Sequence, residues 1–297
     1  LYHLGILQRI VRAMAWVMQR VMRTSGSESL CTSANVFMGQ TEAPLVIQPY
    51  LKGMTKSELM TMMVGGMATI AGGVFAVYHG MGVEAGHLLT ASFMAAPTAL
   101  YMSKILLPET DKSETADGAH DDVKAETTNA LDAMCQGASD GMKLTINVLA
   151  MLIGFTAVIA LFNYLLVLPQ SWAGVGSPVS FDQILGWLNA PFAWLMGVPW
   201  SDCPEIGQAF GKRMVFTEFI GYMEITNAKE TLDPRSFTLA TFAICGFANF
   251  ASIAIQIGGI GSLAPERRKD LASLGLRAMA GGILVGYTNA CIAGLFI

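Results

Sequence analysis

The chain has 297 residues, of which 53% are hydrophobic and only 13% are charged, and its mean hydropathy is +0.49. A soluble domain carries about 25% charged residues, so this composition excludes an ordinary soluble protein and predicts one with much of its surface in lipid. The net charge of −4 is small and scattered along the chain, which argues against nucleic acid as a partner.

The first 28 residues are expected to form an amphipathic helix at the membrane interface. Apolar side chains recur there at helical spacing, and arginines lie between them as far as Arg23. The chain opens at Leu1 and shows no signal-peptide pattern, so we expect upstream helices to precede it in the natural protein.

Long uncharged stretches predict several membrane spans. A helix needs about 20 apolar residues to cross a bilayer. The stretch 144–181 is longer than one span, and Pro169 predicts that its helix ends near Leu168. The predicted spans cover residues 59–83, 85–103, 144–181, 236–265 and 278–297.

Two interruptions separate these spans. Residues 109–126 are acidic and polar without apolar periodicity, which is typical of an exposed loop. Residues 183–201 contain Pro191 and Pro199, so we expect a broken or interfacial segment there.

Two other segments, 29–50 and 206–225, are too polar to span a membrane and too apolar to be ordinary loops. Each contains a Thr-Glu pair, followed by a short polar connection and a long apolar helix. The two helices share the pattern G-x-A-x-x-A-[GS], which begins at Gly66 and at Gly246. Paired re-entrant segments before Gly-interrupted spans indicate a transporter site at a repeat interface. We therefore predict an all-α, polytopic membrane transporter with two re-entrant hairpins and an inverted internal repeat.

These patterns divide the chain into five parts. They are an interfacial helix (1–28), a first repeat (29–107), an acidic loop with an interfacial segment (108–143), a long scaffold span with a broken segment (144–205) and a second repeat (206–297).

The two Thr-Glu pairs carry the first candidate site residues. An ionised carboxylate within lipid is costly, so Glu42 and Glu218 must face protein, water or a ligand. Pro44 disfavours helix before it, and this would aim Gln40 and Thr41 at the same point as Glu42. The alternatives are a capping cluster at Glu42, and at Glu218 an ion pair with Lys212 or Arg213.

Further candidates lie in the helices that follow. Asn249 and Ser252 share one helix face, where an amide and a hydroxyl can hold adjacent sugar hydroxyls. Taken alone, this pair is explained better by polar contacts between helices. Phe247 lies beside them. Asn35 and Thr69 are candidate oxygen donors to a hard cation.

Four stretches of the sequence together resemble the concentrative nucleoside transporters: SANVFMGQTEAPLVIQPYL, GGMATIAGGV, ASFMAAP and CGFANFASI. The resemblance covers nearly the whole chain and corresponds to about the C-terminal three quarters of the family, without its first scaffold helices. It implies a homotrimer whose protomers combine a scaffold with a mobile transport domain.

The resemblance also implies roles for particular residues. It places the nucleobase at the first hairpin and Val74, and the ribose at the second hairpin and the helix after it. A small residue at Gly39 implies broad base selectivity, and Thr217 departs from the Asn that many relatives have. The implied substrate contacts are Gly39, Gln40, Thr41, Glu42, Val74, Glu218, Phe247, Asn249 and Ser252, and the implied sodium ligands are Asn35, Met38, Thr69 and Ile70, the apolar ones through backbone carbonyls.

The function expected on this basis is sodium-coupled nucleoside uptake by elevator-type alternating access in the plasma membrane, or the inner membrane of a bacterium. Sodium would be the coupling ion, with no other cofactor. A proton-coupled symporter and, from another class, a small-solute channel remain alternatives. An enzyme is not expected, because no nucleophile-base or metal constellation is present and the five cysteines are isolated.

Overall fold

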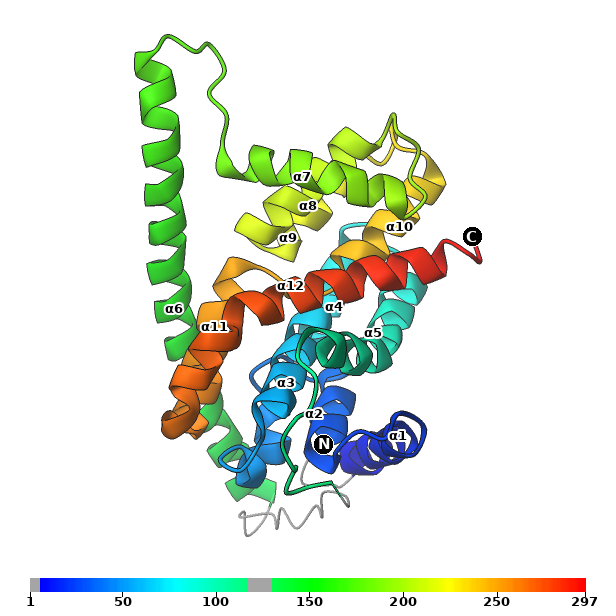
Figure 1. Ribbon diagram of the computed structural model, residues 1–297, viewed down its shortest axis with the longest axis vertical. Coiled ribbons are helices and arrows are strands. Elements are labelled where there is room, and N and C mark those ends of the chain that lie inside the picture. Colours follow the sequence, from blue (N-terminus) through cyan, green and yellow to red (C-terminus); the bar gives the residue numbers. More distant parts are fainter. Residues whose placement is uncertain (1–5, 117–129) are drawn as a thin grey trace.

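The computed structural model describes residues 6–116 and 130–297, and in these ranges it contains helices and no strand, which confirms the all-helical class. Figure 1 shows their arrangement. In chain order they are α1 (Ile6–Met22), α2 (Gly26–Asn35), η1 (Ala43–Tyr50), α3 (Lys56–Ala68), α4 (Gly72–Gly80), α5 (Ala85–Leu106), α6 (Ala130–Trp172), α7 (Phe181–Leu195), α8 (Cys203–Val215), α9 (Glu218–Asn227), α10 (Pro234–Ile244), α11 (Phe250–Leu263), η2 (Pro265–Arg267) and α12 (Arg268–Ala293).

Two of the predicted spans are broken helices. The stretch 59–83 forms α3 and α4, because Thr69 and Ala71 have extended backbone between them. The stretch 236–265 forms α10 and α11, which residues 245–249 separate. The first break lies within the G-x-A-x-x-A-[GS] pattern, and the second begins at Cys245, one residue before its copy of the pattern. The repeated pattern thus overlaps both breaks.

The two breaks lie against each other. Gly246 has a φ of +141°, and a Cβ added there would lie 2.8 Å from the carbonyl carbon and oxygen of Ala68, the last residue of α3. Glycine alone accommodates this dihedral angle without strain, and only its lack of a side chain permits such a close approach. The ends of α3 and α10 therefore meet inside the molecule.

Helices α6 and α7 differ from the prediction. Helix α6 continues past Pro169 to Trp172 and ends where Gly174 takes a φ of +74°, because one missing donor in the last turn is tolerated there. Helix α7 is continuous through Pro191 and ends at Leu195, so the segment 183–201 is interrupted near Pro199 and not at Pro191. Its backbone packs so closely on α8 that a Cβ at Gly207 would lie 2.6 Å from the Gly186 carbonyl oxygen.

The order of elements repeats along the chain. The first series consists of helix α1, the pair α2 and η1, the broken helix α3–α4 and helix α5. After α6, the second series has the same order: helix α7, the pair α8 and α9, the broken helix α10–α11 and helix α12. Each helix pair is a hairpin, called here hairpin 1 (26–50) and hairpin 2 (203–227). A Thr-Glu pair lies at the start of the second arm in both.

The acidic loop is only partly described, since residues 117–129 lie outside the described ranges. Its first part packs on the helix starts at the base of hairpin 1. The Thr115 carbonyl accepts the backbone N–H of Gly26 at 2.8 Å, and Ser113 Oγ donates to Glu58 Oε1 at 2.5 Å. Residues 108–111 are exposed as predicted, whereas Thr115 is buried.

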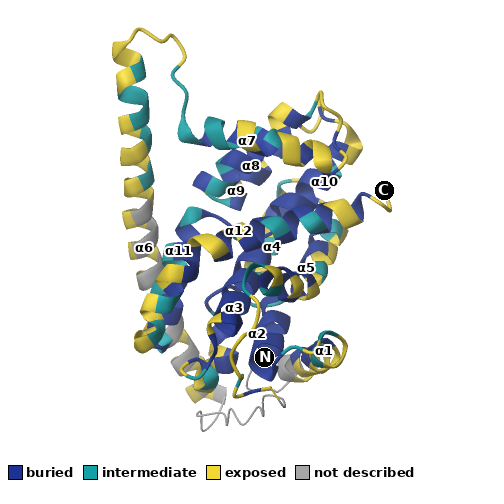
Figure 2. Ribbon diagram, viewed as in Figure 1, coloured by how far each residue is buried: buried dark blue, intermediate teal, exposed yellow. Residues whose placement is uncertain are grey.

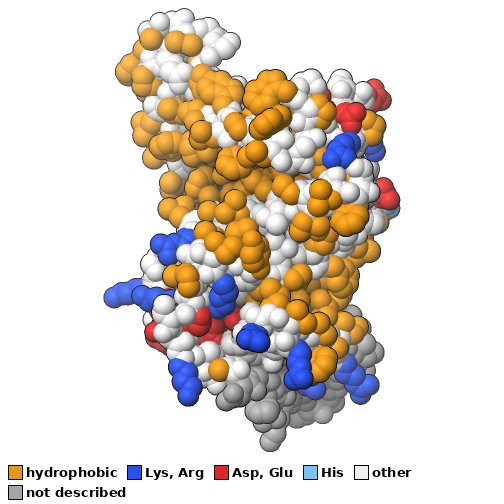
Figure 3. All heavy atoms as spheres, turned by 45° about the vertical axis from the view of Figure 1, so that its right-hand side comes forward, with side chains coloured by type: hydrophobic (Ala, Val, Ile, Leu, Met, Phe, Trp, Pro, Cys, Tyr) orange, Lys and Arg blue, Asp and Glu red, His pale blue; other side chains and the backbone are white. Residues whose placement is uncertain are grey.

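Much of the described surface is apolar. Figure 2 shows α2 and α3 largely buried and α6 largely exposed, and in Figure 3 hydrophobic side chains cover much of the visible face while Lys and Arg gather towards its lower end. Exposed residues of α6 include Leu161, Phe162 and Leu165. By length and composition, two helical segments among the described residues could cross a membrane, Lys56–Gly80 and Pro265–Ala293. An apolar surface of this extent is expected to contact lipid or other helices.

Candidate functional site

The two hairpin tips place their glutamates at the starts of helical arms. Glu42 is the N-cap of η1, and the residues before η1 (36–42) form a turn, as Pro44 predicted. Glu218 is the first residue of α9, with Thr217 as its N-cap. A helix start carries partial positive charge, so both carboxylates occupy favourable positions.

Glu218 is buried and is held by two neutral donors. Tyr78 Oη donates to Oε1 at 2.7 Å, and Asn249 Nδ2 donates to Oε2 at 3.2 Å. Lys212 instead pairs with Glu224 at 2.7 Å, and Arg213 donates to backbone carbonyls. The ion pair that the sequence left open for Glu218 is therefore not formed.

Residues of hairpin 1 and α11 are joined directly. Gln40 Nε2 donates to Ser252 Oγ at 3.1 Å. Asn249 caps α11, because its Oδ1 accepts the backbone N–H of Ser252 at 2.8 Å. Gln40, Ser252, Asn249 and Glu218 thus form one buried polar cluster, brought together from both hairpins and the α10–α11 break.

Glu42 lies beside this cluster with an unused acceptor. Its Oε2 is buried and has no hydrogen-bond partner. The carboxylate folds over Gly39, where an added Cβ would lie 2.0 Å from Oε2. Glycine at position 39 therefore makes room for the carboxylate. A buried carboxylate oxygen without a donor is costly, and a ligand N–H or O–H would satisfy it.

The predicted cation ligands gather at the α3–α4 break. Asn35 is the last residue of α2, and its buried Oδ1 has no hydrogen-bond partner. Its amide nitrogen lies 3.3 Å from where a Cβ would stand on Gly65, in the last turn of α3. Thr69 is the C-cap of α3 and donates through Oγ1 to the Gly65 carbonyl at 3.1 Å, and Ile70 lies in the break itself.

The apolar candidates lie at the edge of the cluster. Met38 follows α2 in the turn of hairpin 1, Val74 lies in the first turn of α4, and Phe247 lies in the α10–α11 break. All three are half-buried and pack against the main hydrophobic core. Each therefore keeps part of its side chain accessible.

Two functional candidates were not foreseen from the sequence. Tyr78 of α4 holds Glu218, which is 140 residues away along the chain. Gln256 Nε2 donates to Gln40 Oε1 at 3.2 Å and to the Met63 carbonyl at 3.1 Å. Gln256 follows Ser252 by four residues on α11, so helical spacing could have indicated it. The pairing of Tyr78 with Glu218 has no local signal.

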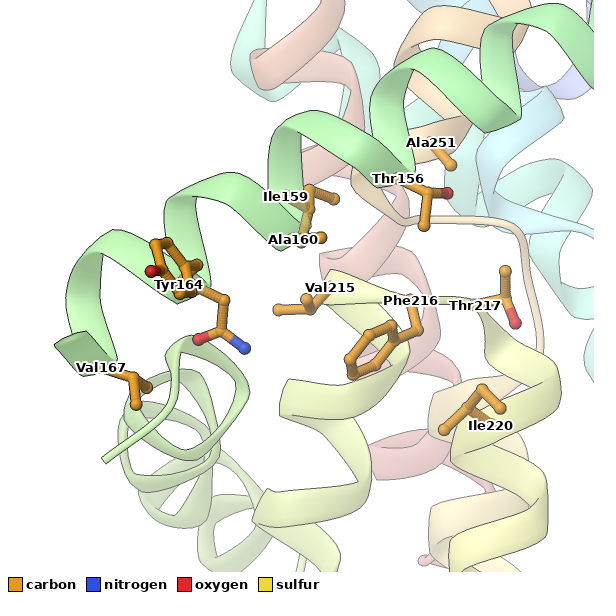
Figure 4. Close-up of a pocket in the computed structure, with 11 residues that line it drawn as sticks. Thr156, Ile159, Ala160, Tyr164, Val167, Val215, Phe216, Thr217, Ile220 and Ala251 are labelled. Carbon is orange, nitrogen blue, oxygen red and sulfur yellow. The ribbon is translucent and has the colours of Figure 1, made fainter. Parts of the chain in front are cut away.

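A cavity of about 600 Å³ lies between α6 and the tip of hairpin 2 (Figure 4). Thr217 and Ala251, which are neighbours of Glu218 and Ser252, line it together with Thr156 and Ile159 of α6. Small-molecule pockets commonly have volumes of about 300–1,000 Å³. The cavity therefore lies next to two members of the polar cluster along the chain, although Glu218 and Ser252 themselves do not line it.

Comparison with known proteins agrees with this arrangement. Residues 87–294 match the family model described as the C-terminus of Na⁺-dependent nucleoside transporters, and residues 1–85 match one described as nucleoside recognition. An uncharacterized transporter of Haemophilus influenzae is 45% identical to this chain, and the alignment covers the whole chain and 72% of that protein. Sodium/nucleoside cotransporter 1 of Mus musculus is 39% identical, and the alignment covers 99% of this chain and 48% of that protein. Among solved structures, CNTnw in an inward-facing, substrate-bound state matches with a TM-score of 0.85 and 41% identity over 99% of this chain and 70% of that one.

Proposed function

The chain belongs to the family of Na⁺-dependent, concentrative nucleoside transporters, and from this membership we propose that it couples inward sodium movement to nucleoside uptake. Its named relatives are membrane transporters and not enzymes. The observation that carries the proposal is the buried polar cluster, in which hydrogen bonds join hairpin 1, hairpin 2 and α11 around a carboxylate without an ion pair.

The nucleoside is proposed to lie across this cluster. Gln40, Thr41 and Glu42 would contact the base, with Gly39 and Val74 beside them. Support comes from Glu42 Oε2, a buried acceptor without a donor. A base carries N–H groups, at ring or exocyclic positions, that could meet this acceptor, and the room that Gly39 gives the carboxylate fits broad base selectivity.

The ribose is proposed to lie at Glu218, Asn249 and Ser252, with Phe247 covering an apolar face. Glu218 accepts two donors in this structure, and an ionised carboxylate has about four lone-pair positions. Two positions therefore remain for the adjacent hydroxyls of a sugar.

Sodium is proposed to bind at the α3–α4 break, with Asn35 and Thr69 as side-chain ligands and Met38 and Ile70 contributing backbone carbonyls. A hard cation prefers oxygen ligands, and the buried Oδ1 of Asn35 is an oxygen without a partner. Sodium there would tie the end of α2 to the end of α3 and so order hairpin 1.

We further propose that the two hairpins and broken helices move together as the transport domain, in an elevator-type cycle of a homotrimer. The two units (29–107 and 206–297) would be inverted repeats, and the hairpins re-entrant. The largely exposed α6 and the cavity on its hairpin side suit a boundary between moving and fixed parts. Coupling follows if the partly loaded domain crosses poorly, since ligands shift only equilibria between states that they bind differently.

The proposed function is tested by sodium replacement. Uptake of labelled uridine into proteoliposomes at constant pH is expected to fall at least about tenfold when choline replaces external sodium, because an absent ligand leaves hairpin 1 unordered. Internal uridine should exceed its external concentration only under an inward sodium gradient.

Two other outcomes would replace this proposal. Unchanged uptake without sodium, together with collapse on adding a protonophore, would favour proton coupling through Glu42 or Glu218. An accumulation ratio near one under every gradient would favour a channel. Competition by adenosine, cytidine and inosine would then establish which bases the site accepts.

The proposed base site predicts an effect of Gln256. Gln256→Leu is expected to raise the KM for uridine about tenfold, because Gln40 loses the buried donor that fixes its amide and a hydrogen bond of this kind contributes about 1 kcal/mol or more. The exposed Gln48 of η1 supplies the control, and Gln48→Leu should leave the KM unchanged. An unchanged KM in Gln256→Leu would show that Gln40 does not need this support.

A further inference from the structure

Arg213 of hairpin 2 is a buried cation without an ion pair among the described residues. It lies near the end of α8 and is 1% exposed. Its Nη1 donates to the Ala243 carbonyl at 2.7 Å, and its Nη2 donates to the Gly246 carbonyl at 3.3 Å. The Glu218 carboxylate is near enough to attract the guanidinium, but the two form no contact ion pair. Burying a guanidinium without a carboxylate in contact costs several kcal/mol, so its other surroundings must compensate.

The compensation comes from the end of a helix. Ala243 and Gly246 stand on either side of Ile244, where α10 stops inside the protein. The last carbonyls of a helix lack intrahelical donors and carry about half a negative charge. Arg213 therefore neutralises the C-terminal end of α10 and connects the first arm of hairpin 2 to the α10–α11 break.

The first unit has a matching break without a matching cation. Helix α3 stops at Ala68, the third residue of the repeated pattern, whereas α10 stops at Ile244, two residues before its copy of the pattern begins. The side chain that stands on the first arm of hairpin 1 near this break is Asn35, which is uncharged and has a partnerless Oδ1. Among the described residues, no Lys or Arg donates to the carbonyls at this break.

We propose that Arg213 is the built-in counterpart of the coupling cation, performing permanently in hairpin 2 what sodium performs reversibly in hairpin 1. This inference rests on the proposed sodium site. Sodium then orders the base side of the site alone. The ribose side, which includes Glu218 and Asn249, stays assembled in both the sodium-loaded and the sodium-free protein.

Hydrogen–deuterium exchange on the full-length protein, in sodium or in choline, tests this inference. In the unmodified protein, sodium should slow exchange in peptides of residues 26–55 and leave those of residues 203–233 unchanged. Arg213→Met should speed exchange in hairpin 2 about tenfold or more in both salts, since loss of a charge-assisted hydrogen bond costs about 1.5–3 kcal/mol. Hairpin 1 should keep its response to sodium.

Transport provides a second readout. Arg213→Met is expected to raise the KM for uridine about tenfold, with the sodium concentration for half-maximal uptake unchanged, because only the ribose side is disturbed. Arg213→Lys should recover part of this loss, since an ammonium keeps the charge but not the two-pronged geometry. Lys212→Met is the matched control. It removes a half-exposed pair with Glu224 and should stay within about twofold of the unmodified protein.

Several results would overturn the inference. They are unchanged hairpin 2 exchange and KM in Arg213→Met, faster exchange spread equally over α5 and α12, or protection of hairpin 2 by sodium in the unmodified protein. Absence of sodium protection in hairpin 1 would instead remove the sodium site, while the effect of Arg213→Met on hairpin 2 would still be measured.

Discussion

Glu218→Gln is expected to reduce nucleoside uptake by at least about 100-fold, because two charge-assisted hydrogen bonds to the ribose would be lost and each contributes about 1.5–3 kcal/mol. The substitution should leave the fold intact. The amide oxygen can face Asn249 Nδ2, and the amide nitrogen can donate to Tyr78 Oη once that hydroxyl turns. What disappears is the negative charge and the free acceptor positions.

The measurement is uptake of labelled uridine, corrected for the amount of protein in the membrane, together with the thermal midpoint in detergent. Glu224→Gln is the control on the same helix. Its carboxylate pairs only with the half-exposed Lys212, so uptake should stay within about twofold. Glu218→Gln with more than a third of normal uptake would remove Glu218 from the ribose site.

The second large effect is expected for Glu42→Gln, with uptake reduced about 30-fold or more. The buried Oε2 of Glu42 has no donor in this structure, so its burial is favourable only when a ligand supplies one, which is worth about 2 kcal/mol or more for a charged acceptor. An amide in the same place is a weaker acceptor and presents an N–H to the donors of the base.

Uridine and adenosine KM values, and the sodium concentration for half-maximal uptake, measure this effect. We expect both KM values to rise far more than the sodium requirement, because the proposed sodium ligands Asn35 and Thr69 are unchanged. Glu84→Gln serves as the control, since Glu84 is an exposed carboxylate at the start of α5. A rise confined to the sodium requirement would move Glu42 from the base to the ion site.

The internal repeat was visible in the sequence, but the sequence did not show where the helices of each repeat are broken. The Thr-Glu pairs predicted two hairpins, and the structure has helix pairs at both positions. The G-x-A-x-x-A-[GS] pattern indicated Gly-interrupted spans, but not that each span divides there into two separate helices. Apolar composition is the same in a straight and a broken helix. The break depends on contacts such as that of Gly246 with Ala68, which lie far apart in the chain.

The sequence by itself determined what local chemistry can determine: a lipid-exposed, all-helical chain, two costly carboxylates, and motifs specific enough to indicate the family. Only the tertiary structure decided how those carboxylates are satisfied. Lys212 and Arg213 were equal candidates for Glu218 in the sequence, but one pairs with Glu224 and the other with the end of α10. Tyr78 took their place from another helix. Burial makes a partner necessary, whereas the identity of that partner depends on which distant segments the fold brings within hydrogen-bonding distance.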